Sequence, residues 1–238
     1  METIKQKGIV LGSIDYKEKD KLVTLFTLEN GIITCVLKSV KSEKAKLKFA
    51  KEPFCFGEFL ISIPSKIITS VEVEDSFFEL TKNIDKLYIA CAILDAVKTV
   101  LPQGEKNPAM FVETLKAIGS ICYDDVNDKY VLTKFLLNIF DAVGYKLALN
   151  KCSVCGQDFG TKRYINLDFG EIVCSGCKTA NCMEISPRCH KTFKILFDTP
   201  YDKLSTLKLS KFSEDEALNV LNLNFEHRFG KKLVIVIW

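Results

Sequence analysis

The sequence predicts an α+β multidomain protein, in which a small β-barrel precedes an all-helical domain that carries an inserted four-cysteine zinc module. Three observations predict this class. The N-terminal part alternates short β-branched and aromatic runs with turn residues, the later part repeats apolar residues at the helical period, and two Cys-x-x-Cys pairs interrupt the helical part. The pattern changes near residue 78. We therefore place the domains at residues 1–77 and 78–238, with the zinc module at about residues 150–182.

Five strands are expected in the first domain. The clearest two, residues 21–28 and 32–37, flank Asn30 and Gly31, a pair that is typical of a tight hairpin turn because both residues adopt positive φ readily. The other three strands are expected at residues 6–14, 53–63 and 67–73. Five short strands with no helical period between most of them fit a small closed barrel. An SH3-like barrel or a half-sandwich would give much the same pattern.

Helical stripes follow from residue 78 onward. The first covers residues 87–101 and ends at Pro102, and Asn107-Pro108 supplies a cap and a first-turn proline for the second. The most regular stripe ends at Gly144. We predict the later helices at residues 132–143, at residues 187–197, and from a capping box at residues 213–216 to Gly230, after which the apolar tail 233–238 packs back.

The cysteine spacing predicts a metal site. Cys152 and Cys155 form one pair and Cys174 and Cys177 another, with eighteen residues between the pairs. Two thiolates on each turn can bind one ion and together complete a tetrahedron, as in zinc ribbons. A thioredoxin-like redox motif would need a single pair at a helix start. Four thiolates leave no open coordination position, so we predict one structural Zn²⁺ ion.

The other six cysteines have other expected roles. Cys182, Cys189 and His190 follow the second pair, and they either form ordinary turn structure or act as substitute ligands or a second partial site. The remaining four stand singly in apolar segments, where a buried free thiol is the usual role. These four are Cys35, Cys55, Cys91 and Cys122.

Composition and motifs argue against an enzyme and against a membrane protein. The chain has two histidines and no nucleotide-binding, metalloprotease or hydrolase motif. No apolar run approaches the ~20 residues that span a bilayer, and a signal-peptide pattern is missing, so we expect a cytoplasmic protein. The formal net charge of +3 falls to +1 once four thiolates hold one Zn²⁺. Affinity for nucleic acid would therefore need a local basic patch.

One segment is strongly basic. Directly after the hairpin, residues 38–51 contain six lysines and a single acidic residue, Glu43. Such a run can be a solvated loop, but beside a small barrel it also fits a surface that follows phosphates while aromatic rings stack on bases. The nearby aromatic residues could equally belong to the core. The candidate DNA-binding residues are Lys38, Lys41, Lys44, Lys46 and Lys48, and the aromatic residues are Phe49, Phe54, Phe56 and Phe59.

These residues together resemble the RecO family of bacterial recombination mediators. The resemblance rests on residues 7–11, 15–16, 20–27 and 31, on the lysine segment leading into Pro53-Phe54, and on Gly144-Tyr145 before the first Cys-x-x-Cys pair. It spans nearly the whole chain. Two departures stand out. Lys38-Ser39 and Lys41 replace the family's usual Lys-Gly and arginine, and residues 231–238 lack the serine and arginine common near the family's C-terminus.

The resemblance implies a fold and a function. The barrel would be an OB-fold that binds single- and double-stranded DNA, and the protein would anneal complementary strands. With RecR it would help to load RecA onto DNA coated by single-strand-binding protein, so we expect a non-enzymatic mediator of DNA repair and homologous recombination. Two alternatives stay open. One is a zinc-ribbon protein-interaction module without DNA binding, and the other, a metal-dependent enzyme, is disfavoured by the four-sulfur site.

Overall fold

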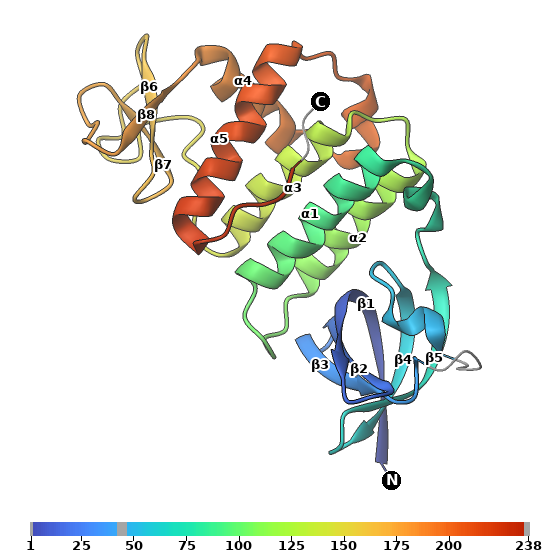
Figure 1. The fold of residues 1–238 in the computed structure, drawn as a ribbon. Helices are drawn as coiled ribbons and strands as arrows, with labels where there is room; N and C mark the ends of the chain where they lie inside the picture. The colour runs from blue at the N-terminus through green and yellow to red at the C-terminus, as the bar shows by residue number, and fades with distance from the viewer. Residues whose placement is uncertain (1, 42–46, 236–238) are drawn as a thin grey trace. The chain divides into compact units, whose positions relative to one another are not determined.

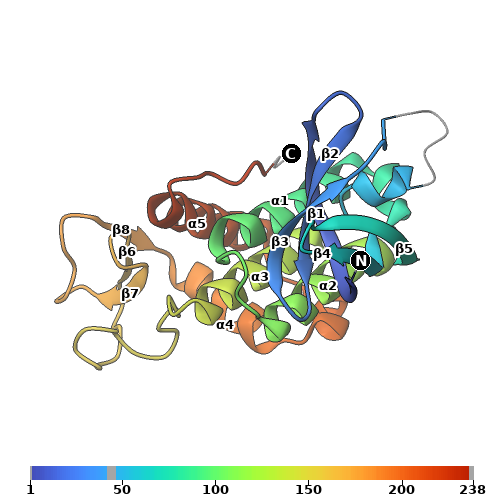
Figure 2. The same ribbon diagram turned by 90° about the horizontal axis from the view of Figure 1, so that it is seen from below.

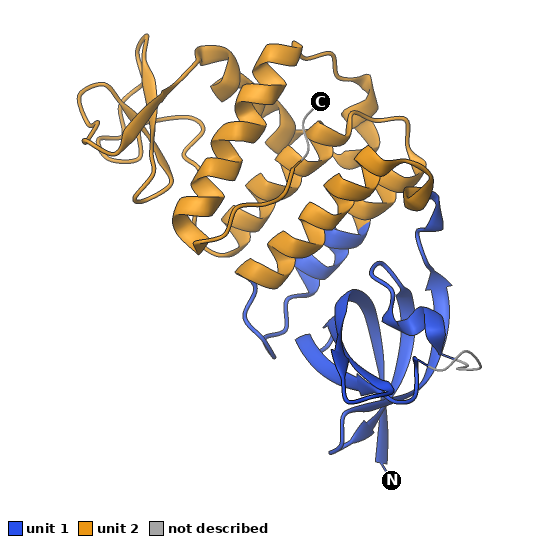
Figure 3. Cartoon of the chain, in the orientation of Figure 1, with its two compact units in different colours: residues 1–79, 101–115 blue, residues 80–100, 116–238 orange. Residues whose placement is uncertain are grey.

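The computed structural model describes residues 2–41 and 47–235 of the chain (Figure 1). The chain divides into two compact units (Figure 3). Unit 1 contains residues 1–79 and Leu101–Leu115, and unit 2 contains Leu80–Val100 and residues 116–238. The domain boundary that we placed between residues 77 and 78 stays a prediction.

Unit 1 contains a closed five-stranded barrel. The five predicted strands are confirmed, and their hydrogen-bonded order is β1-β2-β3-β5-β4. This Greek-key order, in which β5 lies between β3 and β4, is that of the OB-fold expected from the resemblance. The strands are β1 (Glu2–Tyr16), β2 (Asp20–Thr27), β3 (Gly31–Leu37), β4 (Phe56–Ile63) and β5 (Ile67–Asp75), and a short 3-10 helix, η1 (Lys48–Lys51), precedes β4.

The long first strand closes the barrel. Its N-terminal half pairs antiparallel with β4 and its C-terminal half pairs with β2, with a bulge between Val10 and Gly12. On the far side, β3 and β5 meet in parallel at Val36 and Ile67. A bulge bends one strand so that it can serve two neighbours. No second sheet is therefore needed to satisfy its backbone groups.

The barrel core contains two of the aromatic residues that we considered for base stacking. Phe59 is fully buried, because inward positions alternate with outward ones along β4. Phe54 is nearly so, in the turn before β4, where its amide donates to the Val10 carbonyl at 3.0 Å. Phe56 is half-buried, with its ring 6.4 Å from that of Phe111. Phe49, at 41% exposure, is the exposed member of the four. The structure thus assigns Phe54 and Phe59 to the core.

The segment Leu101–Leu115 belongs to the barrel unit, although its helical pattern groups it with the later helices. The Gly104 amide donates to the Ile32 carbonyl at 2.9 Å. The Phe111 ring lies 5.4 Å from the Phe26 ring in an edge-on arrangement. The helical spacing of apolar residues does not by itself show which apolar surface a helix covers.

The predicted helices are confirmed, and α3 is the central one (Figures 1 and 2). It packs against α1, α4 and α5, and nearly all of its residues from Tyr130 to Phe140 are buried. Asn127 and Ser186 cap α3 and α4 through their side chains. The helices are α1 (Ile84–Val100), α2 (Pro108–Tyr123), α3 (Asp128–Ala142), α4 (Pro187–Asp198) and α5 (Lys211–Phe229), with 3-10 helices η2 (Phe78–Lys82) and η3 (Tyr201–Thr206).

The start of the last helix differs from our prediction. Ser210, three residues before the predicted cap, is the N-cap, and its hydroxyl accepts from the Ser213 amide. Ser213 lies within the first turn, and its hydroxyl donates to the Ser210 carbonyl at 2.9 Å. Both serines fit the local cap pattern, and the tertiary position of the acidic residues that follow decides between them.

Those three acidic residues connect helices instead of capping their own. Glu214 accepts from Asn127, the cap of α3, at 3.0 Å. Asp215 pairs with Lys129 at 2.6 Å, and Glu216 accepts from the Ser186 amide at 2.8 Å. Carboxylates are favoured near helix N-termini, where the backbone amides point outward. The acidic run therefore joins the starts of α3, α4 and α5.

The C-terminal tail packs back where the structure describes it. Leu233 is buried, its amide donates to the Asn222 side chain at 3.1 Å, and its carbonyl accepts from the same amide group at 3.3 Å. Val234 is 65% exposed, and residues 236–238 lie outside the described part. In the described part, no helix has the length and apolarity needed to cross a bilayer.

Gly31→Ala is expected to lower the free energy of unfolding by about 3 kcal/mol or more. Gly31 has φ +60°, and an added Cβ would lie 2.0 Å from the Glu105 carbonyl oxygen. Gly104→Ala is the matched control, because Gly104 has φ +75° but nothing within 4 Å of its Cβ position. It should cost only about 1 kcal/mol in urea unfolding. Equal losses would show that the approach of Glu105 is not formed in solution.

Candidate functional site

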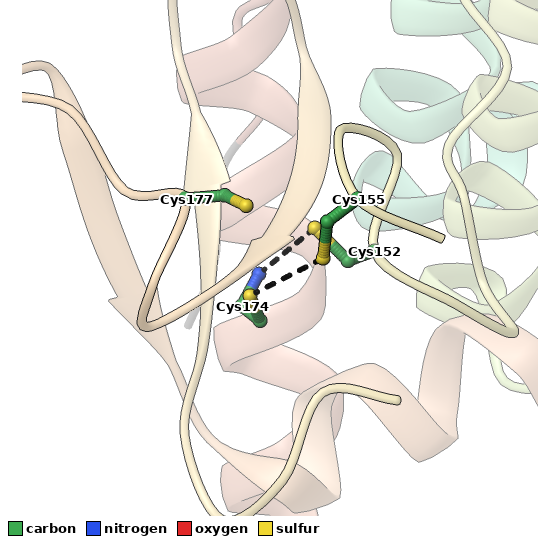
Figure 4. A group of neighbouring side chains, drawn as sticks. All are labelled: Cys152, Cys155, Cys174 and Cys177. Carbon is green, nitrogen blue, oxygen red and sulfur yellow. Dashed lines mark hydrogen bonds between the residues drawn. The ribbon is translucent and has the colours of Figure 1, made fainter. Parts of the chain in front are cut away.

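The first candidate site is the cluster of the four predicted cysteines. It lies beside a small three-stranded sheet of β6 (Arg163–Asn166), β7 (Glu171–Cys174) and β8 (Cys182–Ile185), in the order β7-β6-β8. Cys152 and Cys155 lie in a loop after α3, Cys174 ends β7, and Cys177 lies in the next turn (Figure 4). The structure brings all four sulfur atoms together.

Reciprocal turns position the sulfur atoms. The Gly156 amide donates to the Cys152 carbonyl at 2.9 Å, and the Cys177 amide donates to the Cys174 carbonyl at 3.1 Å. The Cys174 amide also donates to the Cys152 sulfur at 3.4 Å, which links the two turns (Figure 4). These local hydrogen bonds explain why short turns suffice to converge four thiols.

The sulfur spacing fits a metal ion and excludes a disulfide. All four Sγ atoms lie within 4.8 Å of one another, and those of Cys155 and Cys174 are 3.8 Å apart. A tetrahedron with metal–sulfur bonds of about 2.3 Å has sulfur–sulfur edges of about 3.8 Å. A disulfide would need about 2.05 Å. The four cysteines could therefore hold one metal ion.

The charges of the thiols also favour a cation. Burial of Cys152 opposes its ionisation, but hydrogen bonds from the amides of Cys155, Cys174 and Val154 outweigh it and lower its pKa to about 6. In contrast, the hydrogen bond to Cys155, together with burial and the facing Cys152 thiolate, raises the pKa of Cys177 to about 12. Four adjacent sulfurs cannot all become thiolates unless a positive ion balances them.

Cys182, Cys189 and His190 lie outside this four-sulfur group. The Cys182 sulfur accepts from the Thr179 amide at 3.2 Å. Cys189 is buried. The His190 ring packs edge-on against Phe159 with centroids 4.9 Å apart, and burial, with nearby Arg163 and Lys194, lowers its pKa to about 4. Cys189 and His190 belong to α4 and Cys182 to a turn at the start of β8, and the structure gives no support to their role as ligands.

Arg228 attaches the other side of the module to α5. Its guanidinium carbon lies 4.2 Å from the centroid of the Tyr145 ring. A Cβ on Gly170, in the turn between β6 and β7, would lie 2.3 Å from the Arg228 Nε atom. The arginine is therefore enclosed between an aromatic ring and a turn where glycine has φ +64° and leaves room for the guanidinium.

Three of the four single cysteines are buried as predicted, and the fourth is half-buried. Cys35, Cys55 and Cys122 are buried, whereas Cys91 is half-buried. Burial raises the pKa of both Cys35 and Cys55 to about 11. Thiols with such values are not nucleophiles at neutral pH.

The second candidate site is the basic segment on the barrel. Lys38 and Lys48 are exposed residues, and Lys41 is exposed as a whole residue although its side chain is 29% exposed. Lys44 and Lys46 lie outside the described residues. Val40 and Ala50 anchor the described part of the segment in the barrel core, while Lys38 and Lys48 lie on the surface, where a nucleic acid could reach them.

The structure adds lysines that sequence reasoning missed. The Ser39 amide donates to the Asp20 carboxylate at 2.8 Å, and the Lys41 amide donates to the Lys19 carbonyl at 3.2 Å. These bonds hold the end of β3 against the turn between β1 and β2. We call the resulting surface the basic surface. It consists of Lys17, Lys19, Lys21, Lys38 and Lys41.

The sequence only weakly indicates that the missed lysines belong to a basic surface. In the sequence, Lys17, Lys19 and Lys21 alternate with Glu18 and Asp20 and follow Asp15, so the local charge cancels. In the structure, Asp20 is occupied by the Ser39 amide. An alternation of charges in a turn predicts a solvated loop, and only the contact with the chain after β3 shows that its lysines join another basic segment.

Tyr16 is an aromatic residue at this surface that we did not predict. The residue is 38% exposed, and the Lys17 ammonium lies 5.2 Å from the centroid of its ring. Phe49, which we did consider, is 41% exposed. Exposed rings near lysines are the features that stack on unpaired bases.

The comparisons with known proteins cover the whole chain. Residues 1–77 match the family model "Recombination protein O N terminal", and residues 81–234 match "Recombination protein O C terminal". Similar curated relatives are named "DNA repair protein RecO". The one from Clostridium novyi (strain NT) is 26% identical over 98% of this chain and 91% of its own length. The one from Desulforamulus reducens (strain ATCC BAA-1160 / DSM 100696 / MI-1) is 28% identical over 98% and 92%.

Cys174→Ser is expected to abolish metal binding, because three sulfurs and a hydroxyl hold a soft divalent ion far more weakly than four thiolates do. The metal-to-chain ratio, measured by plasma mass spectrometry, should fall from one to near zero. Cys182→Ser is the matched control and should keep the wild-type ratio, since its sulfur is outside the group. Metal retained by the first variant would show that these sulfurs are not the ligands.

Ser39→Gly is expected to raise the free energy of unfolding by about 0.5–1 kcal/mol. Ser39 has φ +54°, a left-handed conformation that costs a residue with a Cβ and suits glycine. Ser65→Gly, at a turn serine without positive φ, should instead lower the stability. Urea unfolding measures both. A loss for Ser39→Gly would mean that its side chain contributes more than its backbone strain costs.

Proposed function

Because this chain belongs to the RecO family, whose two models match residues 1–77 and 81–234, we propose that it is a mediator of DNA repair and homologous recombination. It binds single- and double-stranded DNA and anneals complementary strands. With RecR it helps to load RecA onto DNA coated by single-strand-binding protein. It acts in the cytoplasm, at the nucleoid. The family membership supports these partners, and no contact residues are assigned to them.

The observation that carries the DNA-binding part is the basic surface on a closed OB-fold barrel. The turn between β1 and β2 belongs to the region through which OB-folds bind oligonucleotides. Lysines from two separate segments converge there. Each ammonium group that meets a phosphate releases counterions, which drives binding without reading the sequence. Lys38, Lys41 and Lys48 take part, together with Lys44 and Lys46, which lie outside the described residues.

Charge neutralisation is the proposed mechanism of annealing. Two complementary strands repel each other through their phosphates, and lysines that neutralise part of this charge lower the repulsion while the bases stay free to pair. The exposed rings of Tyr16 and Phe49 can hold single strands by stacking. None of these steps makes or breaks a covalent bond, so the protein acts without catalysis.

We assign the metal as one structural Zn²⁺ ion held by Cys152, Cys155, Cys174 and Cys177. Four thiolates in tetrahedral spacing are the donor set typical of structural zinc, and the four sulfurs lie within 4.8 Å of one another. When bound, the ion supplies no chemistry beyond holding two turns together. The residues around it attach the module to α4 and α5.

One observation favours a second candidate, a zinc-ribbon module that binds proteins and not DNA. Val154 and Phe169, both on the module, are 64% and 63% exposed. Exposed apolar side chains are common at protein-binding surfaces. DNA binding by the isolated protein at moderate salt separates the two functions.

Faster annealing of complementary oligonucleotides, each coated with the cognate single-strand-binding protein, is the expected result when this protein is added without nucleotide. The measurement is fluorescence energy transfer between labelled strands. A folded, metal-loaded protein that leaves the rate unchanged would contradict the mediator function and favour the protein-binding module.

Lys19→Ala combined with Lys38→Ala is expected to flatten the dependence of single-strand affinity on salt. Two lost phosphate contacts change the slope of log affinity against log salt by about 1.4. The matched control is Lys5→Ala with Lys106→Ala, two lysines of the same unit that pair with Glu58 and Glu29. The control removes the same charge and should leave the slope nearly unchanged. Equal slopes for both double variants would show that the basic surface does not contact the phosphates of DNA.

A further inference from the structure

One carboxylate lies in the middle of the basic surface. The Asp15 Oδ1 atom is 3.0 Å from the Lys21 ammonium, and the Oδ2 atom is 3.0 Å from the Lys41 ammonium. Each carboxylate oxygen thus forms an ion pair with one lysine. The bridge joins a lysine of β2 to one that follows β3.

The backbone builds this arrangement. Asp15 and Lys21 are directly opposite each other in the pairing of β1 with β2, so their side chains point to the same face. Lys41 arrives because its amide donates to the Lys19 carbonyl at 3.2 Å, and its ammonium also approaches the Lys17 carbonyl at 3.4 Å. The pairing of the strands therefore brings both lysines to one carboxylate.

The carboxylate is the outermost group of the three. The Asp15 side chain is 68% exposed, whereas those of Lys21 and Lys41 are 20% and 29% exposed. Hydrogen bonds from Lys21 and then Lys41 lower the pKa of Asp15, so it stays ionised at neutral pH. A nucleic acid that approaches this face meets a negative charge first.

We propose that Asp15 occupies a backbone-phosphate subsite of the basic surface, and that a DNA phosphate must replace it to reach Lys21 and Lys41. This inference rests on the proposed function. Two oxygens of one anion bridging two ammonium groups is also how the two non-bridging oxygens of a phosphodiester would bind. Exposed ion pairs contribute little to stability, so a polyanion can displace the carboxylate.

The neighbouring Asp20 has a different role, and this contrast identifies Asp15 as the competitor. Asp20 accepts from the Ser39 amide at 2.8 Å and so holds the chain in place. Asp15 contacts two lysine ammonium groups. Asp15 therefore weakens DNA binding without building the surface, which keeps the strands exchangeable during annealing.

Asp15→Asn tests the inference, because it keeps the shape and removes the charge. Binding to a labelled oligothymidine, followed by fluorescence anisotropy, should become about five-fold tighter at low salt, as one unit charge a few ångströms from a phosphate implies. The slope against log salt should steepen by up to about 0.7, because the two ammonium groups together neutralise one further phosphate. Unchanged or weaker binding overturns the inference and makes Asp15 a positioning residue for the lysines.

Glu58→Gln is the matched control. It removes the same charge from the same barrel, and Glu58 pairs with Lys5 at 2.6 Å, outside the basic surface. Its affinity should stay within about two-fold of the wild type. An equal gain for Glu58→Gln would show that net charge, and not the Asp15 bridge, limits binding, which also overturns the inference.

Lys41→Gln supplies an independent readout. In the wild type it should weaken binding less than two-fold, since Asp15 already holds this lysine. Combined with Asp15→Asn it should remove at least half of the gained affinity, and additive effects would contradict the shared subsite. If no variant and no wild-type protein binds DNA, the proposed function fails as well. Wild-type binding with no response to Asp15→Asn refutes the inference alone.

Discussion

Closure of the barrel depends on β1, which hydrogen-bonds to β4 with its N-terminal half and to β2 with its C-terminal half. An unpaired strand edge would expose a row of backbone donors and acceptors. Because β1 bends and pairs with two strands, most of these groups are hydrogen-bonded. The same closure fixes the register of β1 against β2, and with it the turn that contacts the end of β3. The basic surface follows from this pairing and not from the lysine-rich segment alone.

The four-cysteine module is stabilised differently from the barrel. Its three strands have four residues each, which is too few to build an independent apolar core. Buried Ile165, Ile172 and Val173 form a small apolar layer, and the four converging sulfurs could hold a metal ion, which would contribute folding free energy directly. Arg228 with Gly170 on one side and His190 with Phe159 on the other then attach the module to α5 and α4.

Electrostatics on the barrel are balanced within short distances. Lysines of the basic surface face Asp15 and Asp20, one of which builds the backbone contact while the other bridges ammonium groups. The acidic residues at the start of α5 are balanced in the same way, because each carboxylate binds a polar group at the start of α3 or α4. In both places a local charge pattern acquires its role from a partner far away in the sequence.

Sequence patterns were enough to predict the features that depend on neighbours along the chain, namely the five strands, the helices, the two Cys-x-x-Cys turns and the family resemblance. Periodicity and turn chemistry are local, so they survive without a fold. Four other features became visible in the folded chain alone. Phe54 and Phe59 are core residues, and Ser210, not Ser213, caps α5. Leu101–Leu115 joins the barrel unit, and Lys17 and Lys19 join Lys38 and Lys41. Each of these depends on which surfaces meet when the chain closes, and that information is absent from any local pattern.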